Sequence, residues 1–567
     1  MQFIGLRRSA SASSERQQPG ADSWSCTNRR IIHFLNRQRH AALAAAALTV
    51  MALLVGLVLA PAGATRASKD GGTFRMAITV GIFHAIDPAL YGLESRILRP
   101  ACAALMSYPD KPLPDGLRLT PELAASYPTV SRDRRTYTFT IRKGMRFSDG
   151  SQLTARNVAH ALERIFDPRM KSGAAELFED IVGARQMLAG KTNTLAGVVA
   201  SGTRLRLRLT RPVPDFLART SLLCAVPSAL PADPEGAKPP LASPAPYYVS
   251  EYVPGQRVVL ERNRFYRGQR PHHVDRITVD LQADASAVDD VASGKLDTVA
   301  ATPNLSPELA GLARRYGLNR SRLFVKPDAL TRMFLINTSR PLFRGNPSLR
   351  RALNFAVDRA ALTREFGPYA ATATDHYLPP VMPGFRNERI YPLARPNVRE
   401  ARVLARDRTR SGKAVLYTCS DRPDCVALAQ IFQQNLRTIG LEVRIRQFPL
   451  DLMFQKLSTP GEPYDLAYVG YIADWNDPEQ FLGVFRGGAT ENWTHLNDAR
   501  FNRLLDRAAR LTGPGRYRAY GNLDVQLVRD VAPAVAVLNT NTWAFVSART
   551  GCVVMNPSLD LSAVCLK

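Results

Sequence analysis

The chain has 567 residues, of which 45% are hydrophobic and 22% are charged, and this composition excludes a disordered or collagen-like protein. At roughly 150 residues per domain, the length predicts about three or four domains, enough to bury a core without cross-links. The formal net charge is +26, but basic and acidic residues are interspersed and no nucleic-acid-binding module is evident, so we expect no nucleic-acid partner.

The N-terminal region has the pattern of an export sequence. Residues 41–60 carry no charge and are about long enough to cross a bilayer core. Arginines dominate the residues before them, so the positive-inside rule keeps the N-terminus cytoplasmic and exports the rest of the chain. Small residues around Ala64 offer a cleavage site. Residues 1–67 therefore comprise a basic cytoplasmic segment with either a cleaved signal sequence or an uncleaved membrane anchor, and both alternatives stay open.

Strand and helix patterns alternate from residue 71 onward without an internal repeat, which predicts an α/β architecture. Thr154 is a good N-cap for a helix that ends at Asp167-Pro168, and residues 349–362 are predicted to form a helix of the second half. Further elements are expected, in chain order, as a strand at 73–80, strands at 136–141 and 205–209, a proline-rich crossing segment at 231–246, a helix at 426–436, a strand at 441–448, helices at 501–511 and 516–529, and a strand at 534–538.

All but one of the seven cysteines lie beyond the apolar segment, which suits an exported protein with disulfides. Their spacing suggests two local bridges, Cys419–Cys425 and Cys552–Cys565, and leaves Cys102–Cys224 as a long-range pair. Other connectivities stay open. No Cys-x-x-Cys pair occurs and histidine is sparse, so we expect no metal site and no cofactor.

Residues 136–165, TYTFTIRKGMRFSDGSQLTARNVAHALERI, resemble a specific segment of the extracytoplasmic solute-binding proteins of peptide-type ABC importers. That family has oligopeptide-, dipeptide- and nickel-binding members. Similar matches follow in the family's order at residues 258–268, 293–299 and 349–362, and the resemblance covers about residues 70–550.

This resemblance implies a two-lobed, periplasmic-binding-protein-like clam-shell with an extra subdomain in lobe 1. We expect lobe 1 to comprise residues 68–107, 200–327 and 540–567, the inserted subdomain residues 108–199, and lobe 2 residues 328–539. The resemblance further implies a monomeric, non-enzymatic protein outside the cytoplasm, which captures a short peptide by hinge closure and delivers it to ABC permease subunits in the membrane. An uncleaved N-terminal segment would tether it there.

Asp474 is the candidate ligand carboxylate. A peptide ammonium that is buried on closure without a compensating negative charge would cost several kcal/mol. Residues 464–481, YDLAYVGYIADWNDPEQF, resemble the segment of oligopeptide-binding members whose aspartate binds the peptide amino terminus, and that residue matches Asp474. Tyr471 matches a position where the family typically has Trp, and Trp475 one where another aromatic is common. The alternative is that Asp474 only caps a turn before Pro478, the role that we assign to Asp477.

Phe83 and His84 are further candidate lining residues, because they lie in a loop after the first strand where the family's strand meets the cleft. Three other functions are alternatives: a binder of a metal chelate or other small solute with the same fold, a surface sensor that feeds no transporter, and, more distantly, a secreted hydrolase. No helical pair of histidines, Gly-x-Ser-x-Gly elbow or His-Glu-x-x-His motif supports metal ligation or hydrolysis.

Overall fold

The computed structural model describes residues 70–78, 83, 85–90, 95–284, 286–299 and 308–567. The apolar segment at residues 41–60 and the candidate residue His84 lie outside them. The chain divides into two compact units, Met1–Ala67 and Ser68–Lys567, and the second unit contains every element considered below. Within its described part, no helix is both long and apolar enough to cross a membrane.

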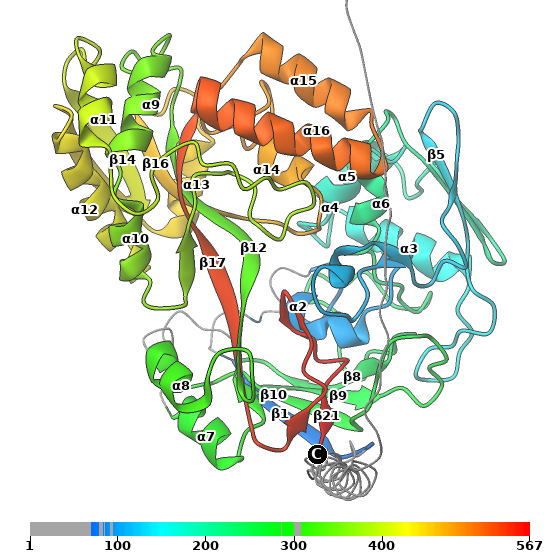
Figure 1. Ribbon diagram of the computed structural model, residues 1–567. Helices are drawn as coiled ribbons and strands as arrows, with labels where there is room; N and C mark the ends of the chain where they lie inside the picture. The colour runs from blue at the N-terminus through cyan, green and yellow to red at the C-terminus, as the bar shows by residue number, and fades with distance from the viewer. Residues whose placement is uncertain (1–69, 79–82, 84, 91–94, 285, 300–307) are drawn as a thin grey trace, which may run out of the picture. The chain divides into compact units, whose positions relative to one another are not determined.

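An 11-stranded sheet runs through the described residues in the order β15-β14-β16-β12-β17-β11-β1-β10-β9-β8, with β13 (Ala371–Ala373) paired to β17 beside this path. Two long antiparallel strands, β12 (Leu323–Ile336) and β17 (Ala534–Val546), connect its two sides (Figure 1). One side contains β14 (Lys413–Cys419), β15 (Glu442–Phe448) and β16 (Leu466–Ile472). The other contains β1 (Thr73–Ala77), β8 (Tyr247–Val253), β9 (Arg257–Arg262), β10 (Arg276–Asp280) and β11 (Thr298–Val299).

Helices cover the β14–β16 side of the sheet and share a hydrophobic core with it. Phe334 of β12 stacks on Phe432 of α12 in this core, with ring centroids 3.8 Å apart. The elements are α9 (Pro347–Ala356), α10 (Arg359–Glu365), α11 (Val398–Ala405), α12 (Pro423–Arg437), α13 (Leu450–Leu457), α14 (Glu479–Gly483), α15 (Ala499–Ala509) and α16 (Gly513–Gln526), which continues into a π-helical turn at Leu527–Val531.

The prediction of one helix at residues 349–362 is wrong. The structure has two helices there, α9 and α10, because Val357 is extended and the Asp358 side chain caps the second helix by accepting the Ala361 N–H at 2.9 Å. Aspartate is favoured at the start of a helix and disfavoured in a helix interior.

A smaller antiparallel sheet, β4-β5-β7-β6, packs with α3 (Ala155–Phe166) around a second core. Its strands are β4 (Thr129–Val130), β5 (Thr136–Thr140), β6 (Val198–Ser201) and β7 (Arg204–Arg208). The period-two pattern of β5 and β7 buries Tyr137, Phe139 and two leucines. The predicted N-cap of α3 is confirmed as a capping box between Thr154 and Asn157.

Short elements complete the fold. They are α2 (Ser95–Leu98), the 3-10 turns η1 (Arg99–Ala101) and η2 (Asp115–Leu117), β2 (Met106–Ser107), β3 (Thr120–Pro121), α4 (Ala175–Phe178), α5 (Ala184–Leu188), α6 (Phe216–Arg219), α7 (Ala287–Ser293), α8 (Leu309–Tyr316), β18 (Thr550–Gly551), β19 (Met555–Asn556), β20 (Ser558–Leu559) and β21 (Cys565–Leu566).

The hydrophobic cores are separate. The largest draws on residues 333–538, the second on residues 89–266, and a third joins residues 74–281 to residues 561–566. The expected boundaries of the lobes and the inserted subdomain stay a prediction.

Disulfides link the described cysteines in the pairs that their spacing suggested. The Cα–Cα distances are 5.2 Å for Cys102–Cys224, 5.4 Å for Cys419–Cys425 and 5.3 Å for Cys552–Cys565. The first bridge spans 122 residues and the second only 6, so they restrict the unfolded chain to very different extents.

We predict that replacing Cys102 and Cys224 together by serine destabilises the protein more than the same change at Cys419 and Cys425. Chain entropy gives about 5 kcal/mol for the long loop and about 2 kcal/mol for the short one. Denaturant unfolding of both double variants measures the difference in the free energy of unfolding. Equal losses would show that loop length does not decide the contribution.

His376 and Asp524 form a buried pair in the core of the β14–β16 side. His376 Nδ1 lies 2.7 Å from Asp524 Oδ2, and its Nε2 lies 2.5 Å from the Glu388 carbonyl oxygen. Burial disfavours the imidazolium, but the hydrogen bond and charge of Asp524 outweigh it and raise the pKa of His376 to about 8. The charged form of His376 therefore stabilises the folded chain.

We predict that this stabilisation is fully present below about pH 6.5, the pKa of an unfolded histidine, and is lost as the pH rises through 8. Between pH 6 and pH 9 the wild type should lose about 2 kcal/mol more of its free energy of unfolding than His376→Asn, which does not titrate. Urea unfolding at both pH values measures this. A variant with the same pH dependence as the wild type contradicts the assignment.

Candidate functional site

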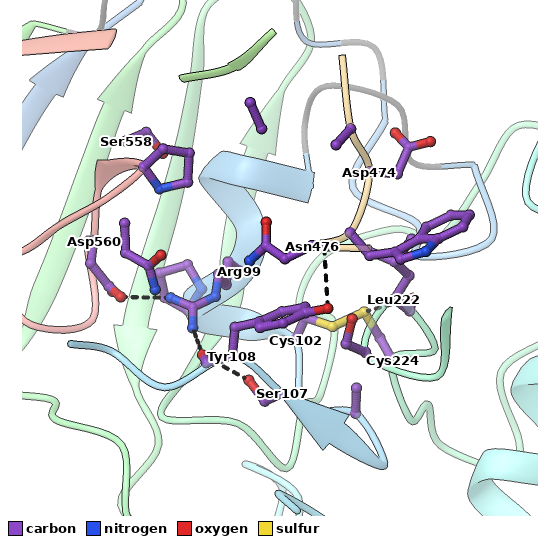
Figure 2. A pocket seen from close by; sticks show the side chains of 18 of the residues that line it. Arg99, Cys102, Ser107, Tyr108, Leu222, Cys224, Asp474, Asn476, Ser558 and Asp560 are labelled. Atoms are coloured by element: carbon purple, nitrogen blue, oxygen red, sulfur yellow. Dashed lines mark hydrogen bonds and ion pairs between the residues drawn. A yellow bond between two sulfur atoms is a disulfide. The ribbon is translucent and has the colours of Figure 1, made fainter. Parts of the chain in front are cut away.

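A cavity of about 540 Å³ lies among segments that are far apart in the sequence (Figure 2). Its described walls come from η1 and Cys102, from β2 and Tyr108, from the loop that follows β16, and from residues 556–561 near the C-terminus. Figure 2 shows Asp474 and Asp560 toward opposite sides of the cavity. The volume is within the range of about 300–1,000 Å³ that is usual for small-ligand sites.

Asp474 presents an exposed carboxylate in the cavity wall. Gln480 orders the backbone around it, because its Oε1 accepts the N–H groups of Asp474 and Trp475 at 2.6 and 3.1 Å. Gln480 Nε2 also lies 3.4 Å from Asp474 Oδ2. The carboxylate is therefore held by a defined loop and remains accessible to a ligand.

Trp475 and Asn476 continue the wall from Asp474 toward β2. The Trp475 side chain is only 6% exposed, and the Arg219 guanidinium lies 5.3 Å from its ring centroid, which fixes the indole by a cation–π contact. The Asn476 N–H donates to Tyr108 Oη at 3.2 Å (Figure 2). Burial raises the pKa of Tyr108 far above its usual range, so this hydroxyl stays neutral.

The structure does not bring Tyr471 and Phe83 into the described cavity wall. Tyr471 lies opposite Thr331 in the β16–β12 ladder, and its hydroxyl donates to Glu491 Oε2 at 3.1 Å. Phe83 is buried in the core on the β1 side, with its ring centroid 5.7 Å from that of Tyr252. A ligand role for either residue stays a prediction.

Asp477 has a larger structural role than the turn that the sequence predicted. Its Oδ1 accepts the Glu479 N–H at 2.9 Å, as a turn residue would. The same carboxylate also forms a buried bidentate pair with Arg516, with Oδ1–Nη2 and Oδ2–Nε distances of 2.8 and 3.1 Å. Arg516 is 39 residues away, so no local sequence signal could have indicated the pair.

A network of charged residues, which sequence reasoning missed, forms another part of the wall. Arg99 Nη1 lies 2.6 Å from both Asp110 Oδ1 and Asp560 Oδ2. Arg270 donates from Nε to Asp110 Oδ2 at 3.0 Å, from Nη1 to Glu122 Oε1 at 3.3 Å and from Nη2 to Ser562 Oγ at 2.8 Å. We call these five charged residues the wall network: Arg99, Asp110, Glu122, Arg270 and Asp560.

The central sheet, the separate cores and the cavity between distant segments make up a two-sided α/β architecture, and solved structures of periplasmic binding proteins share this fold. The family model for the middle part of bacterial extracellular solute-binding proteins, family 5, matches residues 118–493, and the chain belongs to this family. The family resemblance predicted from the sequence is thus confirmed, and the family's members are binding proteins, in agreement with the predicted non-enzymatic role.

Known relatives are similar over most of their length. The chain is 24% identical to the periplasmic oligopeptide-binding protein OppA of Salmonella typhimurium over 424 aligned residues. The alignment covers 71% of this chain and 76% of that protein. It is 23% identical to the dipeptide-binding protein DppE of Bacillus subtilis over 399 aligned residues, which are 67% of this chain and 71% of that protein. The solved structure of clavulanic acid biosynthesis oligopeptide binding protein 2 shares the fold, with a TM-score of 0.78 and 22% identity over 88% of this chain and 96% of that one.

We predict that Asp477→Asn and Asp474→Asn, two changes in one loop, differ sharply in their effect on stability. Asp477→Asn leaves the buried Arg516 guanidinium without its counter-charge and should cost about 3–5 kcal/mol. Asp474→Asn changes an exposed side chain and should cost at most about 0.5 kcal/mol. Denaturant unfolding measures both, and a comparable loss for the two variants contradicts the distinction.

Proposed function

We propose that the chain is the extracytoplasmic substrate-binding component of an ABC importer, which captures short peptides and delivers them to permease subunits in the membrane. The observation that carries the proposal is the exposed Asp474 carboxylate in the wall of a cavity of small-ligand size. Support comes from the family and from relatives whose names specify oligopeptide and dipeptide binding.

The chemistry of capture is a charge pair. A peptide ammonium that enters the cavity loses water, and Asp474 replaces that hydration with an ionic hydrogen bond. The part of Trp475 that lines the cavity, on an indole held by Arg219, supplies an apolar contact for the first side chain. The ligand is thus fixed at its amino end, whatever its side chains.

Capture and release follow from relative movement of two lobes, with boundaries as predicted from the sequence. Ala329, Asp474 and Trp475 belong to proposed lobe 2, whereas Arg99 and Asp560 belong to proposed lobe 1, and all of them line the cavity. A ligand that contacts both groups favours the closed arrangement, because only differential contacts can shift such an equilibrium. The N-terminal segment would export the protein and, if uncleaved, tether it to the membrane.

We predict that Asp474→Asn weakens free tri-alanine at least tenfold and leaves N-acetylated tri-alanine almost unaffected, because only the free peptide carries the ammonium. Isothermal titration calorimetry on protein that has been unfolded and refolded to remove carried ligand measures both affinities. Asp133→Asn is the matched control, since it removes an exposed carboxylate that does not line the cavity. Equal losses for the free and acetylated peptides would remove the proposed role of Asp474.

A further inference from the structure

The charge balance of the wall network bears on the other end of a ligand. The network contains two guanidinium groups and three carboxyl groups, and four of its members line the cavity: Arg99, Glu122, Arg270 and Asp560. Asp110 does not line this cavity, but it contacts both arginines. No other lysine or arginine belongs to the described cavity wall.

The arginines of the wall network already have partners for their charge. Arg270 is 8% exposed, and besides its two carboxylates and Ser562 it donates to the Cys102 carbonyl oxygen at 2.9 Å. Arg99 contacts Asp110 and Asp560 and donates from Nη2 to the Tyr108 carbonyl oxygen. With all three carboxyl groups ionised the network has a net charge of −1, and with one of them protonated it is neutral. In neither state does it offer a ligand an uncompensated positive charge.

A ligand carboxylate inside this cavity would therefore lose its hydration without gaining a counter-ion. It would also approach carboxylates that share the only guanidinium groups of the described wall, so both desolvation and like-charge repulsion oppose it. An uncharged amide at the same place loses much less, because it has no net charge to desolvate and can use the carbonyl and hydroxyl groups of the wall.

We infer that the cavity selects short peptides whose carboxyl end is uncharged, such as peptide amides, over the corresponding free acids. This inference rests on the proposed capture of the amino terminus and adds the chemical class of the ligand's far end. Asp474 and the wall network then divide the recognition: the first requires a positive charge, and the second excludes a negative one.

The selection depends on pH through Asp560. Asp560 faces Arg99 and Asp110, its Oδ1 accepts the Ser562 N–H at 3.0 Å, and the Arg270 charge acts on it as well. Burial and the Asp110 charge raise the pKa of Asp560 to about 6, although Arg99 and Arg270 lower it. Below this pKa the network loses one negative charge, so the penalty on a ligand carboxylate becomes smaller.

The test compares tri-alanine amide with tri-alanine free acid on the full chain by isothermal titration calorimetry at pH 7 and pH 5. We expect the amide to bind at least tenfold more tightly at pH 7, and the ratio to shrink at pH 5. Free acid that binds as tightly as the amide, or more tightly, at pH 7 overturns the inference. N-acetylated tri-alanine amide tests the proposed function separately, since amino-terminal capture fails if acetylation has no effect.

Two variants test whether the wall network is the cause. Asp560→Asn and Glu122→Gln each remove one carboxylate, and each should lower the preference for the amide at pH 7 several-fold by strengthening the binding of the free acid. Asp133→Asn removes the same charge from a residue that does not line the cavity and should keep the wild-type ratio. If a network variant that folds keeps the wild-type ratio of amide to free-acid affinity, the assignment to the wall network is overturned. If the protein binds none of the peptides, both the inference and the proposed function are removed.

Discussion

The antiparallel pairing of β12 with β17 is the constraint on which the rest of the structure depends. Residues 323–327 pair with 541–545, and residues 331–335 pair with 534–539, with a shift of register between Pro327 and Thr331. Pro327 still pairs with Asn541, and the register shifts in the residues that follow it. Proline has no N–H to donate, which favours an irregularity beside it. Where the pairing resumes, the buried Asn539 amide donates to Oγ1 of Thr331, its partner in the ladder, at 2.8 Å. The candidate site follows directly, because the Ala473 N–H donates to the Ala329 carbonyl oxygen at 2.9 Å and so fixes the start of the Asp474 loop.

Arginine serves two distinct purposes in this chain, although the sequence shows only an excess of basic residues. Many arginines are exposed, but some are buried and satisfy oxygen atoms in the interior. Arg164 pairs with Asp87 at 2.5 and 2.8 Å, and Arg359 donates to the carbonyl oxygens of Thr374 and Ala536 at 3.0 and 2.8 Å. The planar guanidinium suits these positions because it presents several donors in fixed directions. A high net charge is therefore a poor guide to the electrostatics of the cavity.

The sequence predicted the features of the fold that depend on neighbouring residues. The alternation in β5, the capping box at Thr154 and the close cysteine pairs are all local, and each was visible as a spacing. Asp474 was predicted as a ligand residue because a short segment resembles a family motif; the structure places it in a cavity wall, and its ligand role stays a prediction. The break at Asp358 was missed because capping and helical periodicity compete over only a few residues.

The wall network could not be found in the same way. Arg99 and Asp560 are 461 positions apart, and nothing near either residue signals the other. Their contact exists only because the C-terminal segment returns to the β1 side of the sheet, where residues 561–566 join the core of β1 and β10. A cavity wall assembled from distant segments is a property of topology, and local pattern carries little information about topology.

The cavity wall also includes both halves of the Cys102–Cys224 disulfide. A bond of this kind forms in oxidising compartments and is rare where thiols are kept reduced. For a chain exported as proposed, the wall is covalently completed only after the membrane has been crossed. A newly made chain in the cytoplasm would lack this covalent link between two segments of its cavity wall.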